Sequence, residues 1–287
     1  MSTIRYGLVG LGWWATDIHI PNLSLIPDAE ITALCSRTEK NLAKGLKVAK
    51  GAPKTYTDFQ AMLKADDVDA VVICTPNGQH GPMATAALEA GKHVLVEKPL
   101  GLTLADCDAA IAAAKRGGKI LQIGVELRYA PVTANLLTLL RRGDIGPLRG
   151  LWIHHFRSPL GKGTWRGQPD QYGDQFLDLG IHYLDLASFL VGAAPTRAWS
   201  AAGFTAPAPD FTHSWTTLDY PNDVRVCVGL FFICRRSGGI RIGAVGETGR
   251  LEAALDQNEI TVIDSQTGNV TVHKTPPSGR PVYGFSR

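Results

Sequence analysis

A lysine stands between a glutamate and a proline at the end of a short apolar run, in residues 92–99 (Lys-His-Val-Leu-Val-Glu-Lys-Pro). The apolar residues 93–96 predict a strand, and Pro99 keeps Lys98 out of the helical region, so the amine is held in extended backbone at the strand end. Ligands of open parallel sheets bind at the carboxyl ends of the strands. Lys98 is therefore a candidate proton donor or acceptor beside the Glu97 carboxylate. The alternative is a surface Glu–Lys pair, which would contribute little.

Asp178 and His182 form a second candidate group, in a stretch predicted to be a helix over Gln175–Val191. Residues four apart share one face of a helix. An imidazole with a pKa near ~6.5 suits proton transfer at neutral pH, whereas a lysine near ~10.4 needs burial or a nearby positive charge to act as a base. The alternatives are a buried core histidine and a carboxylate aligned with the helix dipole.

Residues 10–15 read Gly-Leu-Gly-Trp-Trp-Ala, which fits the pattern G-x-G-x-x-G/A between a predicted strand and a predicted helix. Gly10 would allow the tight turn, Gly12 the close approach of a pyrophosphate, and Ala15 the packing of helix on strand. The phosphates would sit on the unpaired amides of the helix N-terminus. A plain glycine turn is the alternative. The turn residues expected to border a dinucleotide are Gly10, Leu11, Gly12, Trp13 and Trp14, with one tryptophan beneath the cofactor and the other in the core or at the rim.

Ser36 and Arg37 follow the second predicted strand, where an NAD-selective site usually carries a carboxylate for the ribose 2′-hydroxyl. A guanidinium can instead pair with a 2′-phosphate and cover the adenine. Lys40 would add positive charge. The sequence therefore favours NADP(H) over NAD(H), unless Arg37 only stacks on the adenine.

The elements that must position these residues follow two patterns. Strand and helix signals alternate over residues 1–124, which predicts a doubly wound parallel sheet with helices on both faces. Residues 125–287 predict an α+β domain with a large, mostly antiparallel open sheet. Predicted strands are 4–9, 31–35, 70–74, 93–96 and 120–123, then 198–204, 215–220, 224–233, 240–245, 259–263 and 270–274. Predicted helices are 38–49, 84–90, 105–115, 132–141 and 175–191.

Composition excludes several classes of protein. The 287 residues carry a net charge of +3, with 45% hydrophobic and 19% charged residues, as in ordinary globular proteins. No basic tract suggests a nucleic-acid partner, and no stretch approaches the ~20 apolar residues of a membrane helix. No signal peptide is visible and none of the five cysteines forms a C-x-x-C pair, which predicts a cytoplasmic protein with free thiols and without a metal site.

Together these motifs resemble the Gfo/Idh/MocA family of nicotinamide-dependent oxidoreductases. The resemblance covers most of the chain and is strongest over residues 4–192. The matching elements are Gly10-x-Gly12-x-x-Ala15, His19-x-Pro21, Thr75-Pro76-Asn77-x-x-His80, Glu97-Lys98-Pro99, Trp165-Arg166 and Asp178-x-x-x-His182-x-x-Asp185. The family implies a Rossmann domain followed by a sheet domain whose open face makes homodimers or homotetramers, and substrates such as sugars and polyols.

The resemblance also implies roles for individual residues. Thr75, Pro76, Asn77 and His80 would line the cofactor crevice, and Glu97 and Lys98 would approach the nicotinamide. Trp165 and Arg166 look like the pair that reaches the cofactor from the second domain, and Glu126 stands where relatives touch cofactor or substrate. The bond before Pro99 is often cis in relatives.

Two departures concern the second domain. The glycine-rich lead-in to the Asp/His helix is reduced to Gly173-Asp174-Gln175, and the chain stops at Arg287, tens of residues earlier than most relatives. We expect either a trimmed chain or a branch without the final helix.

The sequence thus predicts an NAD(P)-dependent dehydrogenase or reductase that acts on CH–OH groups of a sugar, polyol or related carbonyl compound. Lys98 and His182 would both contact the reacting oxygen, and Asp178 would bind another hydroxyl or orient His182. Which of Lys98 and His182 is the general acid/base stays open, as do the substrate and the physiological direction. The alternatives are a non-catalytic cofactor-binding regulator, which the presence of both residues disfavours, and an enzyme that recycles a tightly held cofactor.

Overall fold

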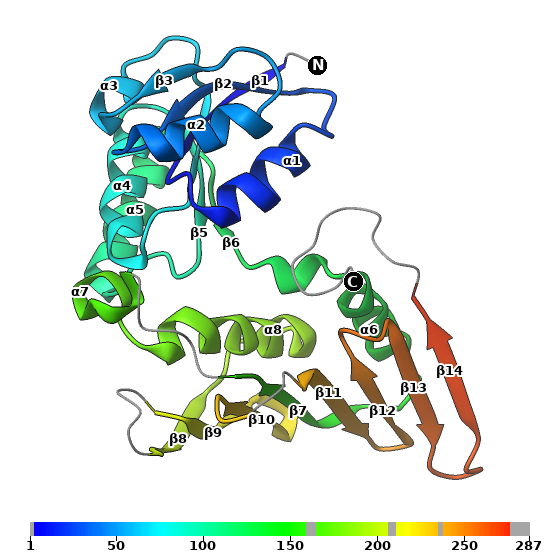
Figure 1. Cartoon of the computed structure of the whole chain (residues 1–287). Coiled ribbons are helices and arrows are strands. Elements are labelled where there is room, and N and C mark those ends of the chain that lie inside the picture. Colours follow the sequence, from blue (N-terminus) through cyan, green and yellow to red (C-terminus); the bar gives the residue numbers. More distant parts are fainter. Residues whose placement is uncertain (1–2, 159–164, 206–210, 235–237, 276–287) are drawn as a thin grey trace. The chain divides into compact units, whose positions relative to one another are not determined.

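The computed structural model describes residues 3–158, 165–205, 211–234 and 238–275. Its contacts divide the chain into two units, Met1–Val125 with Lys162–Asp178, and Glu126–Gly161 with Leu179–Arg287. The predicted boundary between residues 124 and 125 lies next to the first change of unit. The described residues 165–178 come later in the sequence but group with the first unit. Each unit contains one sheet (Figure 1).

The first unit is built on a six-stranded parallel sheet with strand order β3-β2-β1-β4-β5-β6. The order reverses beside β1, so the carboxyl ends of β1 and β4 flank a topological switch point, where open sheets bind ligands. The strands are β1 (Ile4–Val9), β2 (Ala29–Cys35), β3 (Lys54–Tyr56), β4 (Ala70–Ile73), β5 (His93–Glu97) and β6 (Leu121–Gly124).

Helices cover both faces of this sheet, because successive buried side chains of each strand point to opposite sides. Leu8 of β1 belongs to a cluster with the helices that follow β1 and β2, and Val9 to a cluster with the three later helices. Thr38 and Thr103 cap two of these helices by accepting from Asn41 N and Asp106 N. The helices are η1 (Ala15–His19, a π-helix), α1 (Ile20–Leu23), α2 (Glu39–Val48), α3 (Phe59–Leu63), α4 (Asn77–Glu89) and α5 (Leu104–Gly117), with η3 (Trp165–Gly167), α7 (Pro169–Tyr172) and η4 (Phe176–Gly180) from the later segment.

Helix α4 begins at Asn77, seven residues before the helix predicted from Ala84. The glycines in the first turns of α4 lower its helix propensity, but they allow neighbouring helices to approach closely. A Cβ on Gly78 would lie 2.1 Å from the carbonyl oxygen of Asp170, and one on Gly81 would lie 2.6 Å from Cβ of Asp106. The first turns of α4 therefore accept α7 and α5 at backbone distance, and this tertiary contact outweighs the low helix propensity of glycine.

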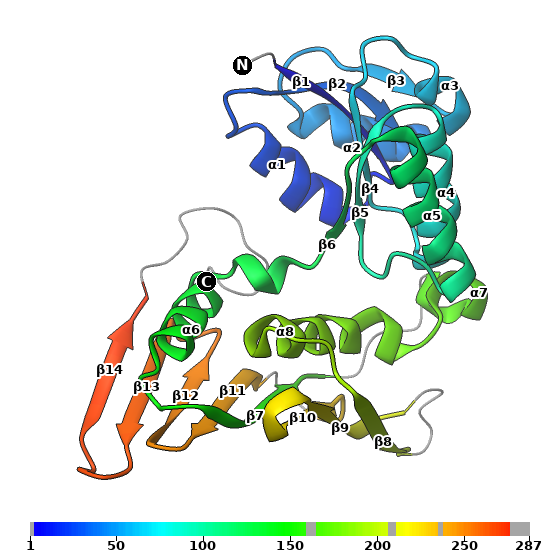
Figure 2. The same cartoon turned by 180° about the vertical axis from the view of Figure 1, so that it is seen from behind.

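The second unit contains an eight-stranded sheet with strand order β14-β13-β12-β11-β7-β10-β9-β8. Its pairs are antiparallel except β7 with β10, so the predicted fold class is confirmed for both units. Helix α8 packs on β7 and β10, and α6 packs on β13 (Figure 2). The elements are η2 (Glu126–Tyr129), α6 (Pro131–Arg142), β7 (Leu148–Phe156), α8 (Ile181–Val191), β8 (Arg197–Gly203), β9 (His213–Tyr220), η5 (Pro221–Asp223), β10 (Val224–Phe231), β11 (Gly239–Gly246), β12 (Gly249–Ala254), β13 (Glu259–Asp264) and β14 (Val270–Lys274).

Three findings concern the described residues as a whole. All five cysteines are free thiols. The searched ranges hold no group of three or more His, Cys, Asp or Glu side chains that could bind a metal ion. Within the same ranges, no helix combines the length and the apolar character needed to cross a bilayer.

His154 and His155 of β7 point to opposite faces of the second sheet, as neighbouring residues of a strand do. His155 faces α8, where its Nδ1 lies 2.6 Å from the buried hydroxyl of Tyr183. Burial, with a smaller contribution from the charge of Arg157, lowers the pKa of His155 to about 3. Burial likewise raises the pKa of Tyr183. The pair is therefore neutral in the folded protein at neutral and mildly acidic pH.

We predict that His155 makes the protein acid-sensitive. Its pKa is about 3 when folded and near ~6.5 when unfolded, so the unfolded chain binds the extra proton and stability falls as pH drops from about 6.5 towards 3. At pH 5 the loss should be roughly 2 kcal/mol. Thermal unfolding of His155→Gln should depend less on pH between 7 and 4.5 than that of wild type. Tyr183→Phe leaves the histidine buried and should keep the steep dependence. Equal slopes for wild type and His155→Gln would contradict the assignment.

Candidate functional site

The turn after β1 has the geometry that a dinucleotide phosphate requires. Gly10 has φ +85°, and a Cβ there would lie 2.6 Å from the carbonyl carbon and oxygen of Cys74. By contrast, a Cβ built on Gly12 meets no atom within 4 Å, so the turn is open at that residue. A helical run starts at Trp13 directly after it. The turn therefore presents open backbone at a helix N-terminus, which fits a bound pyrophosphate.

Of the other turn residues, Leu11 is buried in the core of the first unit, so only its backbone can border a ligand. Trp13 is 51% exposed, and Trp14 turns its indole N–H towards Glu97. The role of a tryptophan beneath the cofactor stays a prediction.

Ser36 and Arg37 differ in burial and in their contacts within the protein. Ser36 is buried and its backbone N–H donates to Tyr56 O. Arg37 is exposed, and its guanidinium has no hydrogen bond or ion pair with the described residues. Arg37 is thus available to a ligand at the end of β2.

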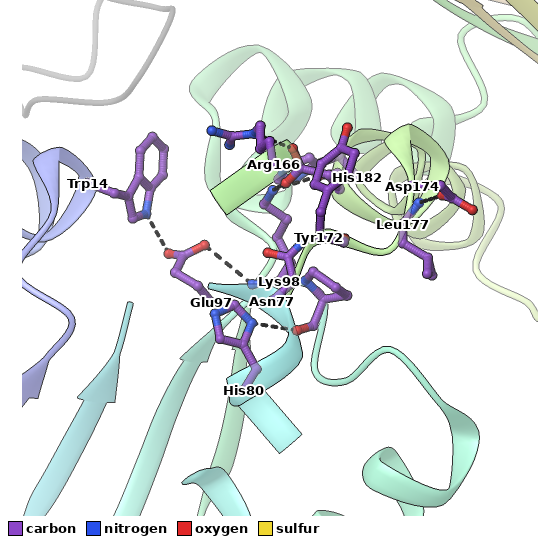
Figure 3. Close-up of polar contacts among 12 residues, drawn as sticks. Trp14, Asn77, His80, Glu97, Lys98, Arg166, Tyr172, Asp174, Leu177 and His182 are labelled. Atoms are coloured by element: carbon purple, nitrogen blue, oxygen red, sulfur yellow. Dashed lines mark hydrogen bonds and ion pairs between the residues drawn. The ribbon is translucent and has the colours of Figure 1, made fainter. Parts of the chain in front are cut away.

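Glu97 is a buried carboxylate held by the helical run that follows the glycine turn. Its Oε1 accepts from Trp14 Nε1 at 2.6 Å and lies 2.8 Å from Nε2 of His19, as Figure 3 shows for the indole. Burial would raise the pKa of Glu97, but the hydrogen bonds from His19 and Trp14 outweigh it and hold the pKa below its usual value. The structure therefore ties the end of β5 to the turn. The His-x-Pro motif contained the signal for His19, but its partner could not be named from sequence.

His80 and Asn77 serve as internal ties of the first unit. The two ring nitrogens of His80 lie 2.7 Å from Pro99 O and 2.8 Å from Thr75 O. Burial lowers the pKa of His80 although both carbonyls oppose this shift. The side-chain amide of Asn77 donates to Tyr172 O at 3.0 Å. Their predicted place beside the cofactor stays a prediction, as it does for Thr75 and Pro76 at the carboxyl end of β4.

Lys98 is held by Asp178. Its Nζ donates to Asp178 Oδ1 at 3.0 Å and to the carbonyl oxygen of the same residue at 2.6 Å. Arg166 Nε donates to the other carboxylate oxygen at 3.0 Å (Figure 3). Asp178 is 1% exposed. Burial would raise the pKa of Asp178, but the charges and hydrogen bonds of Lys98 and Arg166 outweigh it and keep the pKa below its usual value.

The segment that carries Arg166 and Asp178 is fixed to α4. Gln79 donates to Gln171 at 3.0 Å, and Gly78 admits the Asp170 carbonyl described above. The Arg166 guanidinium also lies 4.5 Å from the ring centroid of Trp165, a cation–π contact. The structure therefore brings Lys98, Asp178 and Arg166 together, a grouping that the sequence did not predict. The cofactor contacts expected of Trp165 and Arg166 stay predictions.

His182 lies in the second unit with Glu126. The predicted helix over 175–191 is present as one uninterrupted helical run, in which residues 176–180 form the π-helix η4 and α8 continues from Ile181. Nδ1 of His182 is 3.4 Å from Oε2 of Glu126, and both groups are largely buried. A contact of Glu126 with cofactor or substrate stays a prediction.

Arg128 pairs through two nitrogens with the carboxylate of Asp185. Its guanidinium also lies 5.2 Å from the ring centroid of Phe189.

Comparisons with known proteins agree with this architecture. The family model described as "Oxidoreductase family, NAD-binding Rossmann fold" matches residues 4–125, and the model "GFO/IDH/MocA C-terminal domain" matches residues 133–252. The uncharacterized oxidoreductase YrbE of Bacillus subtilis is 26% identical over 94% of this chain and 79% of its own length. The myo-inositol 2-dehydrogenase of Thermotoga maritima is 34% identical over 66% of this chain, which spans 55% of that relative.

Among solved structures, the aldose-aldose oxidoreductase of Caulobacter crescentus, complexed with glycerol, has a TM-score of 0.83 and 26% identity over 99% of this chain and 86% of its own. A levoglucosan dehydrogenase in complex with NADH and levoglucosan, at 20% identity and a TM-score of 0.85, shows the same fold. Because the two family models match residues 4–125 and 133–252 in order, the chain belongs to the Gfo/Idh/MocA oxidoreductase family.

Proposed function

We propose that this protein is an NAD(P)-dependent oxidoreductase that transfers a hydride between nicotinamide and a hydroxyl or carbonyl group of a sugar or polyol. The observation that carries the proposal is the Lys98 ammonium, fixed by Asp178 at the carboxyl end of β5 in the unit that holds the open glycine turn. A lysine placed only for stability would be expected on the surface. This one is paired with an almost fully buried acid.

Alcohol oxidation removes a hydride from carbon and a proton from oxygen. A bound nicotinamide supplies the hydride chemistry, and the protein handles the proton and the geometry. We propose that Lys98 and His182 contact the reacting oxygen, Lys98 as a hydrogen-bond donor and His182 as the acceptor of its proton. Both carboxylate oxygens of Asp178 already accept from Lys98 or Arg166, which supports an anchoring role for Asp178.

The relatives support a substrate with several hydroxyl groups. They include a myo-inositol 2-dehydrogenase, a D-glucoside 3-dehydrogenase and a D-apiose dehydrogenase, of which this chain spans 55%, 58% and 55%. The aldose-aldose oxidoreductase among the structural relatives favours, as a second candidate, an enzyme that recycles a tightly held cofactor. Absorbance at the reduced-nicotinamide band of purified, dialysed protein separates this candidate from a dehydrogenase with exchangeable cofactor.

We predict that Lys98→Met lowers kcat by ~10²-fold or more with cofactor affinity near normal, because the hydrogen-bond donor to the reacting oxygen is lost while the glycine turn at residues 10–15 is untouched. Turnover should be measured with a panel of sugars and polyols, and cofactor affinity by fluorescence titration. Lys115→Met, at an exposed position of α5, is the matched control and should leave both unchanged. Because the change also removes a partner of buried Asp178, thermal unfolding should accompany the kinetics. A folded Lys98→Met enzyme with full turnover would refute the assignment.

We also propose a preference for NADP(H). Arg37 is exposed and uncommitted at the end of β2, where a carboxylate would otherwise select the 2′-hydroxyl of NAD. Lys40, the second residue of α2, is exposed as well. A guanidinium at this position can donate two charge-assisted hydrogen bonds to a 2′-phosphate.

We predict that Arg37→Ala raises the KM for NADP(H) about tenfold or more and changes the KM for NAD(H) much less, because a charge-assisted hydrogen bond to the phosphate is worth roughly 1.5–3 kcal/mol. Michaelis constants for both cofactors, in wild type and variant, are the measurement. Lys47→Ala removes an exposed charge from the last turn of α2 and serves as control. An equal loss with both cofactors would mean that Arg37 only covers the adenine.

The second sheet supports a proposal on assembly. On the face opposite α6 and α8, rings lie flat over glycines of neighbouring strands, and a Cβ on Gly243 or Gly229 would meet Trp152 at 1.7 Å or His154 at 2.9 Å. Phe156 and Phe231 stack with centroids 5.0 Å apart, and Trp215 packs edge-on against Phe231 at 5.1 Å. We name this surface the aromatic face (Trp152, His154, Phe156, Trp199, Trp215 and Phe231). The aromatic rings gathered in the middle of this face suit a second copy of this chain, so we propose a homodimer or homotetramer through it.

We predict that Trp215→Lys converts the oligomer to monomer, because it places a charge in the centre of the aromatic face. Trp215 is 43% exposed, so the substitution should leave the fold intact. Size-exclusion chromatography with light scattering measures the mass. Leu104→Lys, at an 83% exposed site on α5, is the control that adds the same charge elsewhere. A monomeric wild type, or an unchanged mass in Trp215→Lys, would overturn the proposal.

A further inference from the structure

The carboxylate of Glu97 lies where three segments of the first unit meet. Glu97 is the last residue of β5, and its Oε1 accepts from Trp14 Nε1 at 2.6 Å and lies 2.8 Å from Nε2 of His19. Trp14 and His19 belong to the helical run that begins directly after the glycine turn. At the end of β6, a Cβ on Gly124 would lie 2.8 Å from the same Oε1. The absence of a side chain at Gly124 therefore leaves the space that the carboxylate occupies.

The second carboxylate oxygen of Glu97 accepts from Lys98. Oε2 lies 3.3 Å from the backbone nitrogen of Lys98, and the Glu97 side chain is 11% exposed (Figure 3). The hydrogen bonds described above keep Glu97 ionised by holding its pKa below the usual value. Since an ionised carboxylate only accepts hydrogen bonds, Nε2 of His19 carries the proton in its contact with Oε1. One carboxylate thus receives N–H groups from the helical run on one oxygen and from Lys98 on the other.

A buried acid is not needed merely to join two segments. Apolar side chains of similar volume often replace a buried polar pair without loss of stability. Charge-assisted hydrogen bonds differ from apolar contacts because they fix direction as well as distance. The ammonium end of Lys98 is in turn held by Asp178. The helical run after the glycine turn therefore constrains the backbone from which the ammonium of Lys98 extends.

We propose that Trp14 and His19 are positioning residues that act through Glu97. They couple the glycine turn of residues 10–15, where we expect the cofactor diphosphate, to Lys98, so that ligand binding at the turn and the placement of the ammonium depend on each other. Such a coupling is reciprocal, because a ligand that favours one placement of Lys98 binds more tightly in that placement by the same free energy. The inference deepens the proposed function and rests on it for its catalytic part, but the coupling can be measured without turnover.

Two other titratable groups near Glu97 are neutral at neutral pH. Burial raises the pKa of the Cys74 thiol well above its usual value, and the charge of Glu97 adds to this shift. Burial lowers the pKa of the His80 imidazole, although the charge of Glu97 opposes it. Lys98 adds a positive charge whose attraction lowers the pKa of Glu97 further. A titration of Glu97 therefore reports its hydrogen bonds together with this charge.

The first test follows the titration of Glu97 by NMR of protein labelled with ¹³C at the glutamate carboxyl carbons, with Glu97→Gln to assign the signal. Trp14→Phe and His19→Leu each remove one donor and should each raise the pKa of Glu97 by about one unit, a tenfold change in proton affinity. His19→Gln keeps an N–H donor and should restore part of the shift. Trp199→Phe removes an indole N–H at a 63% exposed site of β8 and is the matched control, which should titrate as wild type does. Wild-type titration in both Trp14→Phe and His19→Leu would overturn the inference.

The second test measures the coupling itself. ADP carries a diphosphate without the nicotinamide riboside, so it should fill the glycine turn without reaching Lys98. We expect saturating ADP to shift the backbone amide resonance of Lys98 in the ¹H–¹⁵N spectrum of wild type and of Trp199→Phe. In Trp14→Phe and His19→Leu the shift should be at most about half as large. Failure of ADP to bind, no shift in wild type, or an equal shift in both variants would each contradict the coupling.

Kinetics separate this inference from the proposed function. With an active sugar or polyol, Trp14→Phe and His19→Leu should lower kcat about tenfold with little change in the KM for that substrate, and His19→Gln should recover part of the loss. Wild-type kcat in both variants would mean that the two residues do not position Lys98 for the reaction, and the inference would be wrong. If the NMR coupling is found but wild type turns over no sugar or polyol, the coupling holds and the proposed function fails.

Discussion

A single buried carboxylate determines much of the arrangement in the first unit. Asp178 is almost fully enclosed, and an ionised acid in that position requires partners that satisfy its charge. Lys98 supplies one and Arg166 the other, from segments 80 and 12 residues away in sequence. Since removal of one partner of a buried pair typically costs 3–5 kcal/mol, the end of β5 and the segment 165–178 constrain each other. The position of Lys98 and the packing of the later segment onto α4 therefore depend on each other.

Glycine makes this arrangement possible by removing side chains at the points of closest approach. Gly10 lets the phosphate turn pass the end of β4, and Gly78 lets α7 reach the backbone of α4. Any Cβ at Gly78 would displace the segment that carries Asp178. A glycine also allows close packing on the outer face of the second sheet, where the indole of Trp152 lies against Gly243. Glycines that weaken local propensity are therefore the ones that fix tertiary distances in both units.

The sequence predicted what depends on local pattern. The strands with alternating or continuous apolar residues and the helices with threonine caps were found with ends within a few residues, and the topology followed from their alternation. Three strands have no counterpart among the predicted ranges. β3 has three residues, and β12 reads Gly-Arg-Leu-Glu-Ala-Ala, without a β-branched residue. In β7 an arginine, a glycine and two histidines interrupt the apolar residues. The hydrogen-bond and ion-pair partners of side chains could not be predicted from the sequence, for another reason. His19 and Glu97, or Arg166 and Asp178, are selected by packing, and nothing in a residue's neighbours along the chain names its partner in space.

The two residues proposed to handle the proton each have a carboxylate within their own unit, and the two acids differ in what they can do. Asp178 binds an ammonium through a side-chain and a main-chain oxygen, so it holds Lys98 as a donor with a fixed direction. Glu126 places a carboxylate oxygen 3.4 Å from Nδ1 of His182, so it brings a negative charge close to the imidazole. An oxygen that loses a proton as its carbon loses a hydride needs both a donor and an acceptor. In the proposed function the lysine is the donor and the histidine the acceptor at that oxygen.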